Sequence, residues 1–345
     1  MLRYCANIIL FGGTFLLIMV GKAQDPQFSQ FFATRIYMNP AFTGNTHFGR
    51  VSSQFRMQWP GLGGYTTNGF YYDQNLPALK SGIGFRALQD WQSGGGLFYN
   101  KMAAMYAYGT NLTRKLYMRA GIAASYNTYS VNLTPFTFTD ELLSGSTSTT
   151  DDYRFNKLKF FDADAGVLIY NESFWVGTSF TNLIQRGRQN PVQLSNPHPT
   201  KFSLHGGALI PVKKDIQGNF HRSVTLAAHY KSQLKYDQLD FGAYYGYSYI
   251  LVGVWYRGLH VVKDNNATPV NNDAIILVFG VNHEGMRISY SFDLNVSPLH
   301  SYSYGAHELT LQFELWRKHK WQLKKNSKKQ IPCPDFGPGW QKEDT

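Results

Sequence analysis

The chain has 345 residues, of which 16% are aromatic and only 16% are charged, and its formal net charge at pH 7 is +11. Soluble globular domains average about 25% charged residues, so this composition suits an outer-membrane β-barrel, although a secreted β-sandwich or lectin would share it. Beyond residue 23 no run of 18 apolar residues occurs, which argues against helical membrane spans.

Residues 1–23 have the pattern of a secretory signal peptide. Arg3 supplies a positive start, residues 8–20 (IILFGGTFLLIMV) form the apolar run, and Gly21 and Ala23 are the small residues before the expected cleavage point. The run is shorter than the roughly 20 residues that a spanning helix needs. We expect cleavage near Ala23 and a mature protein outside the cytoplasm, where a nucleic-acid partner is not expected.

Residues 24–46 follow as an aromatic-rich segment with neither helical nor strand periodicity, and Asn39-Pro40 gives it a turn signal. So aromatic a segment is not expected to remain solvated. We predict that it packs against or within the barrel described next, through Phe28, Phe31, Phe32, Asn39, Pro40 and Phe42.

Residues 47–316 show the alternation of apolar and polar residues that is typical of barrel strands. In ELTLQFEL, for example, Leu309, Leu311 and Phe313 alternate with Glu308, Thr310 and Gln312. The pattern predicts an all-β, transmembrane antiparallel β-barrel of about 14 strands, with 12 to 16 left open. The expected strands are 47–59, 65–76, 79–89, 97–112, 115–129, 159–171, 173–183, 201–213, 221–233, 236–246, 248–258, 271–282, 284–294 and 303–316.

The connections between these strands alternate in length. Short turns are expected at Pro77-Ala78, Thr113-Arg114, Asn171-Glu172, 214–219, Tyr247-Ser248 and His283-Glu284, whereas the opposite ends include long connections at 131–156, 184–199 and 259–270. Outer-membrane barrels have short periplasmic turns and longer extracellular loops. The asymmetry therefore predicts an outer-membrane barrel with its long loops extracellular and with both chain ends in the periplasm.

Residues 317–345 form a basic tail, RKHKWQLKKNSKKQ followed by IPCPDFGPGW. We expect it on the periplasmic side, with Lys324, Lys325, Lys328, Lys329 and Cys333 as candidate contacts for a periplasmic partner or for anionic lipid head groups. Cys333 is the sole cysteine after signal-peptide cleavage, so an intrachain disulfide is not possible.

The sequence contains no recognisable catalytic, metal or cofactor motif. Its histidines lack the HExxH spacing of a zinc enzyme, no G-x-S-x-G elbow occurs, and GLGGYTTNG lacks the lysine of a phosphate loop. Asp151-Asp152 and the pair Asp162 and Asp164 are interpreted as a polar loop and a polar barrel interior rather than as metal ligands. We therefore predict a non-enzymatic protein without a cofactor.

Five stretches, in order, carry a family resemblance: DPQFSQFFATRIYMNPAFTG, FRMQWPGLGGYTTNGFYYDQNL, FDADAGVLIYNESFWVGTSFTNL, ISYSFDLNVSPL and GAHELTLQFEL. Together they resemble the PorP/SprF family of the Bacteroidetes type IX secretion system, from about Gln24 to Leu315. The resemblance implies an outer-membrane barrel that helps to export and retain a large surface adhesin of the gliding type. It also implies other secretion components as partners, some of them periplasmic, beside the lipid bilayer and lipopolysaccharide.

The candidate partner-binding residues lie in loops expected to be extracellular: Trp91, Pro135, Phe136, Phe138, Asp140, Arg186 and Arg188. Aromatic side chains are favoured there because they are enriched where interfaces bind tightly. The alternative function is an outer-membrane channel for small or hydrophobic solutes, which should conduct ions where a plugged anchor should not.

Overall fold

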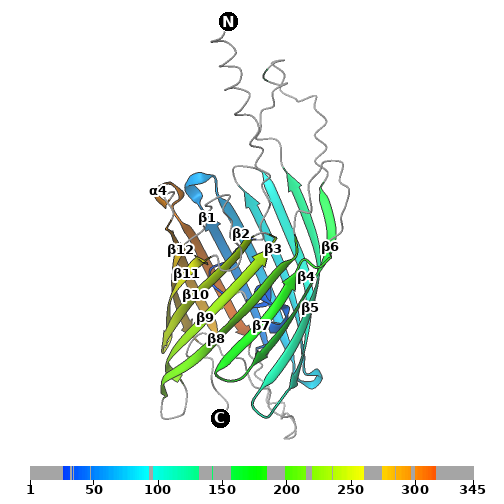
Figure 1. Ribbon diagram of the computed structural model, residues 1–345, viewed down its shortest axis with the longest axis vertical. Helices are drawn as coiled ribbons and strands as arrows, with labels where there is room; N and C mark the ends of the chain where they lie inside the picture. Colours follow the sequence, from blue (N-terminus) through cyan, green and yellow to red (C-terminus); the bar gives the residue numbers. More distant parts are fainter. Residues whose placement is uncertain are drawn as a thin grey trace, which may run out of the picture. The chain divides into compact units, whose positions relative to one another are not determined.

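The computed structural model describes residues 26–31, 33, 35–46, 48–92, 96–131, 142, 157–184, 199–214, 220–234, 236–259, 274–283, 285–296 and 300–315. All of these residues belong to one compact unit, which contains every element below. Fourteen strands form a closed antiparallel barrel in which each strand pairs with its neighbours in sequence and β1 pairs with β14 (Figure 1). The prediction of about 14 strands is confirmed.

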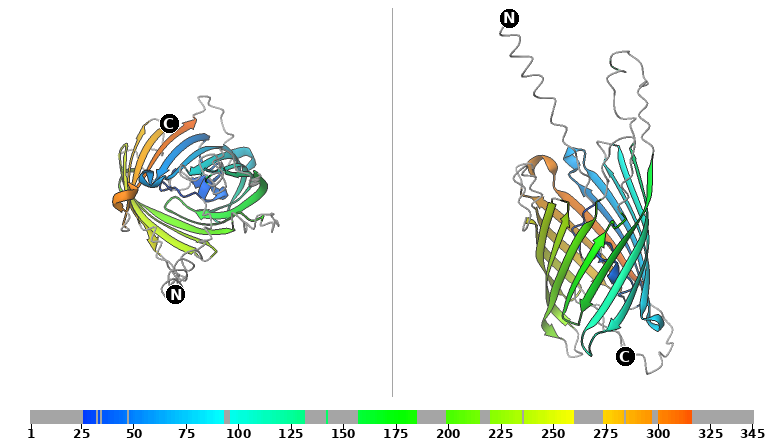
Figure 2. Two further views of the ribbon diagram at one scale, coloured as in Figure 1. Left: turned by 90° about the horizontal axis from the view of Figure 1, so that it is seen from above. Right: turned by 45° about the vertical axis from the view of Figure 1, so that its right-hand side comes forward.

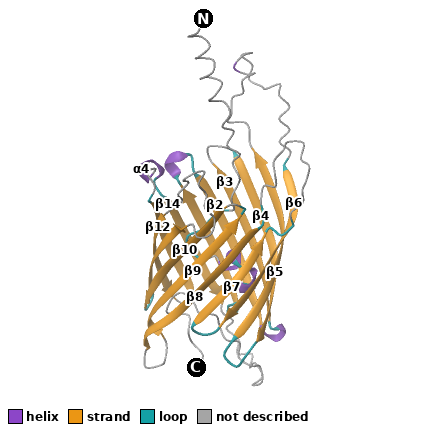
Figure 3. Cartoon of the chain, in the orientation of Figure 1, coloured by secondary structure: helices purple, strands orange, loops and turns teal. Residues whose placement is uncertain are grey.

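The strands run as follows: β1 Gly49–Gln58, β2 Tyr65–Leu76, β3 Ser81–Gln92, β4 Leu97–Asn111, β5 Tyr117–Val131, β6 Leu158–Tyr170, β7 Phe174–Thr181, β8 Lys201–Lys214, β9 Phe220–Gln233, β10 Tyr236–Tyr247, β11 Ile250–Leu259, β12 Ala274–His283, β13 Met286–Asn295 and β14 Ala306–Leu315. Every observed bound lies within three residues of the predicted one. The helical turns are α2 Arg35–Met38, η1 Pro40–Phe42, η2 Pro60–Leu62, η3 Pro77–Leu79 and α4 His300–Ser303 (Figure 3). Within the described residues, none of the helices has the length and apolar character to cross a membrane.

At two strand ends, left-handed backbone explains the small difference from the predicted bound. Trp59 was expected to be the last residue of the first strand, but its φ of 54° ends β1 at Gln58 and starts η2. The last strand was expected from residue 303, but α4 and the positive φ angles of Tyr304 and Gly305 delay β14 to Ala306. Extended strands do not accommodate positive φ angles.

The two ends of the barrel differ in their connections. At one end, here called the turn end, the connections are brief: 77–80, 112–116, 171–173, 215–219, 248–249 and 284–285. The opposite end, here called the rim end, has η2, α4 and the connections 132–157, 182–200 and 260–273. All the predicted short turns fall at the turn end, and the predicted long connections fall at the rim end.

Alternate residues of the strands face the lumen and the outer surface. On β12 the outward residues Ile275, Leu277, Phe279 and Val281 are 40–51% exposed, while the residues between them are buried. A closed barrel satisfies all backbone hydrogen bonds between strands, which is why such a barrel with an apolar outer face can cross a membrane.

Candidate functional site in the barrel lumen

Residues 26–46, here called the plug, lie inside the ring of strands (Figure 2). Its described part contributes no strand to the barrel, and it contains only the short turns α2 and η1. Phe28, Phe31 and Phe42 are 1–6% exposed, Asn39 is fully buried and Pro40 is buried, whereas Phe32 lies outside the described residues. The lumen is therefore a packed protein interior along the plug.

The plug runs from the rim end towards the turn end. Near the rim end, Arg257 of β11 donates from Nη2 to the carbonyl oxygen of Phe28 at 3.1 Å. Towards the turn end, the amide of Gly44 donates to Oδ2 of Asp73 at 2.9 Å, and Asp73 also pairs with Arg50 at 2.9 Å. Residues 26–30 thus lie inside the barrel near its rim end. Both chain ends, which the sequence placed in the periplasm, fall outside the described residues.

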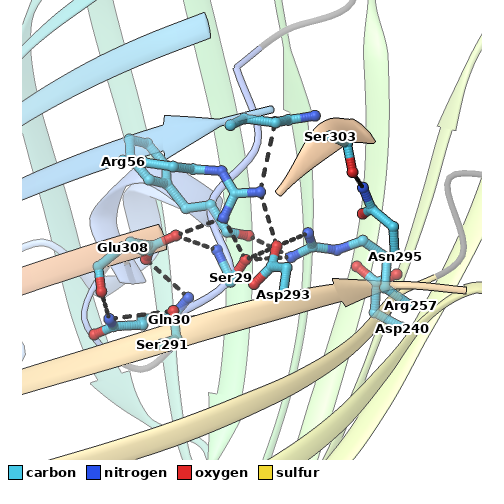
Figure 4. Close-up of polar contacts among 12 residues, drawn as sticks. Ser29, Gln30, Arg56, Asp240, Arg257, Ser291, Asp293, Asn295, Ser303 and Glu308 are labelled. Atoms are coloured by element: carbon cyan, nitrogen blue, oxygen red, sulfur yellow. Dashed lines mark hydrogen bonds and ion pairs between the residues drawn. The ribbon is translucent and has the colours of Figure 1, made fainter. Parts of the chain in front are cut away.

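Four buried charged side chains, here called the rim cluster, hold the start of the plug: Arg56, Arg257, Asp293 and Glu308 (Figure 4). Arg56 bonds Asp293 at 2.8 Å and Glu308 at 3.1 Å, and Arg257 bonds Asp293 at 2.8 Å. The strand register explains the meeting, because Arg56 of β1 lies directly opposite Glu308 of β14 at the seam that closes the barrel. The cluster contains two positive and two negative groups, so its charges balance.

Ser29 and Gln30 of the plug fit into the rim cluster. Their backbone amides donate to the two oxygens of Glu308 at 2.7 and 3.0 Å. The Ser29 hydroxyl donates to Asp293 at 2.7 Å and accepts from Arg56 at 2.6 Å and Arg257 at 2.8 Å. Hydrogen bonds to charged groups are the stronger class, so this is a firm attachment point.

A second set of charges contacts the middle of the plug. Arg86 of β3 donates to Asp164 at 2.7 Å and reaches the carbonyl oxygens of Ile36 and Tyr37 at 3.5 and 3.4 Å. Lys101 of β4 lies 3.4 Å from the other oxygen of Asp164. The strand carboxylate that the sequence assigned to a polar interior is thus part of a buried ion-pair network beside the plug.

The side chain of Asn39 holds the half of the plug that lies towards the turn end. Its Oδ1 accepts from the Ala41 amide at 2.8 Å, which caps η1. Its Nδ2 donates to the carbonyl oxygens of Val167 and Thr178, both at 3.1 Å, and lies 3.0 Å from Nε2 of His205. These contacts join the plug to β6, β7 and β8 at once.

An apolar cluster completes the packing of the plug. Phe31 packs on Trp255 with ring centroids 4.6 Å apart, and Phe42 lies 5.3 Å from the His205 ring. The same cluster includes the inward-facing Ile276 and Val278 of β12. The interior is therefore polar around the rim cluster and apolar beside the aromatic residues of the plug, which differs from the wholly polar interior that alternation predicts.

Replacing Asn39 by Ala should loosen the Pro40–Thr43 turn by about 1–3 kcal/mol, because the cap and a buried amide with several partners are both lost. Hydrogen exchange should report this as faster exchange of the Ala41 amide and its neighbours. Asn100→Ala is a matched control, since Asn100 is half-buried on β4 and bonds only Thr128 in the described hydrogen bonds, at 3.4 Å. Unchanged exchange in the Asn39 variant would contradict the assignment.

Most of the predicted partner-binding residues lie outside the described residues. These are Pro135, Phe136, Phe138, Asp140, Arg186 and Arg188, together with the tail residues Lys324, Lys325, Lys328, Lys329 and Cys333 and the pair Asp151-Asp152. Trp91 was expected in a loop, but it lies on β3, which extends to Gln92 because it stays paired with both neighbouring strands. It is half-buried near the rim end, opposite Thr66 of β2 and Phe98 of β4.

Sequence reasoning assigned no role to the rim cluster. Alternation along their strands puts Arg56, Asp293 and Glu308 on the polar side, and that position is the signal the sequence offers. Within the described residues, no three side chains of His, Cys, Asp or Glu gather as metal ligands. The chemistry that the described lumen offers is recognition of a polypeptide backbone by paired charges, amides and aromatic rings.

Several solved outer-membrane proteins are similar to the chain at 8–9% identity. The toluene transporter TbuX of Ralstonia pickettii is 9% identical with a TM-score of 0.44, and the match covers 86% of this chain and 96% of TbuX. The toluene transporter TodX of Pseudomonas putida has the same identity and TM-score, with 81% and 91% covered. KdgM porin is 8% identical with a TM-score of 0.34, with 77% and 99% covered.

No curated protein matches the chain significantly in sequence. The sequence model of one family, described as type IX secretion system membrane protein PorP/SprF, matches residues 20–313. This match spans the plug and nearly all of the barrel. The chain therefore belongs to the PorP/SprF family of type IX secretion system membrane proteins, and it is an outer-membrane β-barrel.

Proposed function

We propose that the protein is a non-enzymatic, plugged barrel that helps the type IX secretion system to export a large surface adhesin and to anchor it at the cell surface. The observation that carries this proposal is the filled lumen, in which the plug is held by the rim cluster and by Asn39. A barrel closed in this way offers its ends, rather than its interior, to other proteins.

The rim end is the proposed surface for the adhesin. It has the longest connections, and long loops of outer-membrane barrels are extracellular. The turn end and the basic tail would then face periplasmic components of the secretion system, while the outer face contacts lipid and, in the outer leaflet, lipopolysaccharide. Signal-peptide cleavage near Ala23 would leave the mature chain to begin just before the plug.

A channel for small or hydrophobic solutes is the competing function. A solute channel needs a continuous path through the barrel, and the plug places buried aromatic side chains across that path. The apolar cluster joins plug residues to inward-facing residues of β2, β4, β5, β6, β7, β10, β11 and β12. Hydrogen bonds add contacts of the plug with β3, β8 and β14. This supports an anchor over a channel.

The proposal is tested by affinity purification of the tagged protein from native membranes after mild cross-linking. A secreted protein of high mass should co-purify, and Trp91→Ala at the rim end should lower its recovery about fivefold or more, as hot-spot truncations do. Tyr249→Ala is the matched control, because Tyr249 is an exposed aromatic residue in a turn-end connection. Absence of any such protein, or equal loss in both variants, would contradict the proposal.

A further inference from the structure

We infer that the lumen is a peptide-binding site in its own right, whose occupant, the plug, can leave the barrel and bind to it again. The site recognises a peptide with a capped Asn-Pro turn that is followed by a glycine. This chain supplies that peptide from its own residues 26–46. Binding of the plug involves only the barrel and residues 26–46, so it does not depend on an adhesin.

The barrel is closed without the help of the plug. β1 pairs with β14 from Gly49 opposite Leu315 to Gln58 opposite Ala306, which completes the ring. The described part of the plug takes no place in the strand pairing. Removing it therefore breaks no strand ladder, and the backbone groups of the wall keep their partners.

Four glycines form a floor under residues 39–43 of the plug: Gly82 of β3 and Gly121 of β5 lie against its backbone, and Gly166 of β6 and Gly177 of β7 lie against the Asn39 side chain. A Cβ atom on Gly121 would lie 2.4 Å from the Ala41 nitrogen, and one on Gly166 would lie 2.2 Å from Oδ1 of Asn39. A Cβ atom on Gly82 would lie 2.4 Å from the Thr43 carbonyl oxygen. Glycine in a strand often marks such a close approach of another backbone.

The turn that sits on this floor is organised by its own hydrogen bonds. The Phe42 amide donates to the Asn39 carbonyl and the Thr43 amide to the Pro40 carbonyl, both at 3.1 Å. Asn39 caps the turn through its side chain. A ligand that holds its bound conformation by itself loses less entropy on binding, so residues 39–45 have the character of a preformed ligand.

The rim cluster remains neutralised when the plug is absent. Arg56 is paired with Asp293 and Glu308, and Arg257 with Asp293, through strand side chains alone. Water entering the vacated lumen can take the places of Ser29 and Gln30, so release of the plug leaves no buried charge without a partner. Binding and release can then occur with the barrel folded.

The test separates the plug from a barrel that has already folded. A site-specific protease sequence is inserted after Thr46, the full chain is refolded and then cut, and a fluorescent synthetic peptide of residues 24–46 is added. Saturable uptake is expected in the cut barrel and not in the intact one. An Asn39→Ala peptide should bind about tenfold more weakly or worse, because its amide contacts are missing.

The floor is tested with a pair of glycine variants of the cut barrel. Gly166→Ala should reduce peptide uptake strongly, whereas Gly280→Ala should not, because a Cβ atom on Gly280 would meet Ser289 at 3.2 Å and no plug atom. Circular dichroism and heat-modifiable migration verify that each barrel stays folded. Loss of the barrel when the plug leaves, failure of the labelled peptide to exchange, or equal uptake by both variants would overturn the inference.

Discussion

Asp293→Ala should destabilise the barrel by about 3–5 kcal/mol, the range for removing one partner of a buried ion pair. Asp293 accepts from Arg56, Arg257 and Ser29, and its side chain is 2% exposed. Without it, Arg257 loses its carboxylate and Arg56 keeps only Glu308. Urea unfolding of the refolded protein in detergent, followed by heat-modifiable migration, measures the change.

Two further variants show whether the lost stability comes from a buried charge that is left without a partner. Adding Arg257→Met to Asp293→Ala should recover part of the stability, because it removes the guanidinium left without a carboxylate. Glu172→Ala, in the exposed turn between β6 and β7, should change stability by less than about 0.5 kcal/mol. A change below about 1 kcal/mol in the Asp293 single variant would mean that the rim cluster contributes little.

Leu277→Arg should cost about 2–4 kcal/mol if the outer face of β12 contacts the bilayer core. Leu277 lies in the middle of the strand and is 46% exposed on the apolar outer face. A guanidinium there would have to enter hydrocarbon. Refolding into lipid vesicles and unfolding by urea give the free energy.

Leu79→Arg is the matched control for that substitution. Leu79 is 65% exposed in η3, between two strands at the turn end, and therefore outside the expected hydrocarbon layer. Its replacement should be nearly neutral. Equal costs at the two leucines would show that the outer face of β12 is not in contact with the membrane core.

The fold could be predicted from sequence because successive residues of a barrel strand face opposite sides of the wall, so that apolar and polar residues alternate. β14 is the clearest instance, with buried Glu308 and Thr310 alternating with the outward Leu309 and Leu311. Strand ends were less predictable where a single residue adopts left-handed backbone, as Trp59 does. Side-chain pattern does not encode that choice.

The site could not be predicted to the same extent, because its residues meet only after the barrel closes. Arg56 and Asp293 are 237 residues apart in sequence, and their contact depends on the register of β1, β14 and β13. Asn39 was selected as a packing residue, but its bonds to the carbonyls of Val167 and Thr178 require the position of the plug over β6 and β7.

The apolar part of the lumen shows the same limit of sequence reasoning. Ile276 and Val278 face inward although alternation predicts a polar interior, because they join the apolar cluster of the plug. The continuous apolar run AIILVFGV shows that both faces of β12 are apolar. The reason for an apolar inner face becomes clear only once the apolar part of the plug is placed in the lumen. The contacts proposed for the rim loops and the basic tail stay predictions.

Ion conductance in planar lipid bilayers tests most directly whether the plug closes the barrel. The mature protein and a variant that lacks residues 26–46 are purified as folded barrels and measured side by side at the same protein concentration. The mature protein should give no stable conductance steps, whereas the variant without the plug should give steady open-channel currents. Equal, steady conductance by both proteins would contradict a plugged anchor and favour a solute channel.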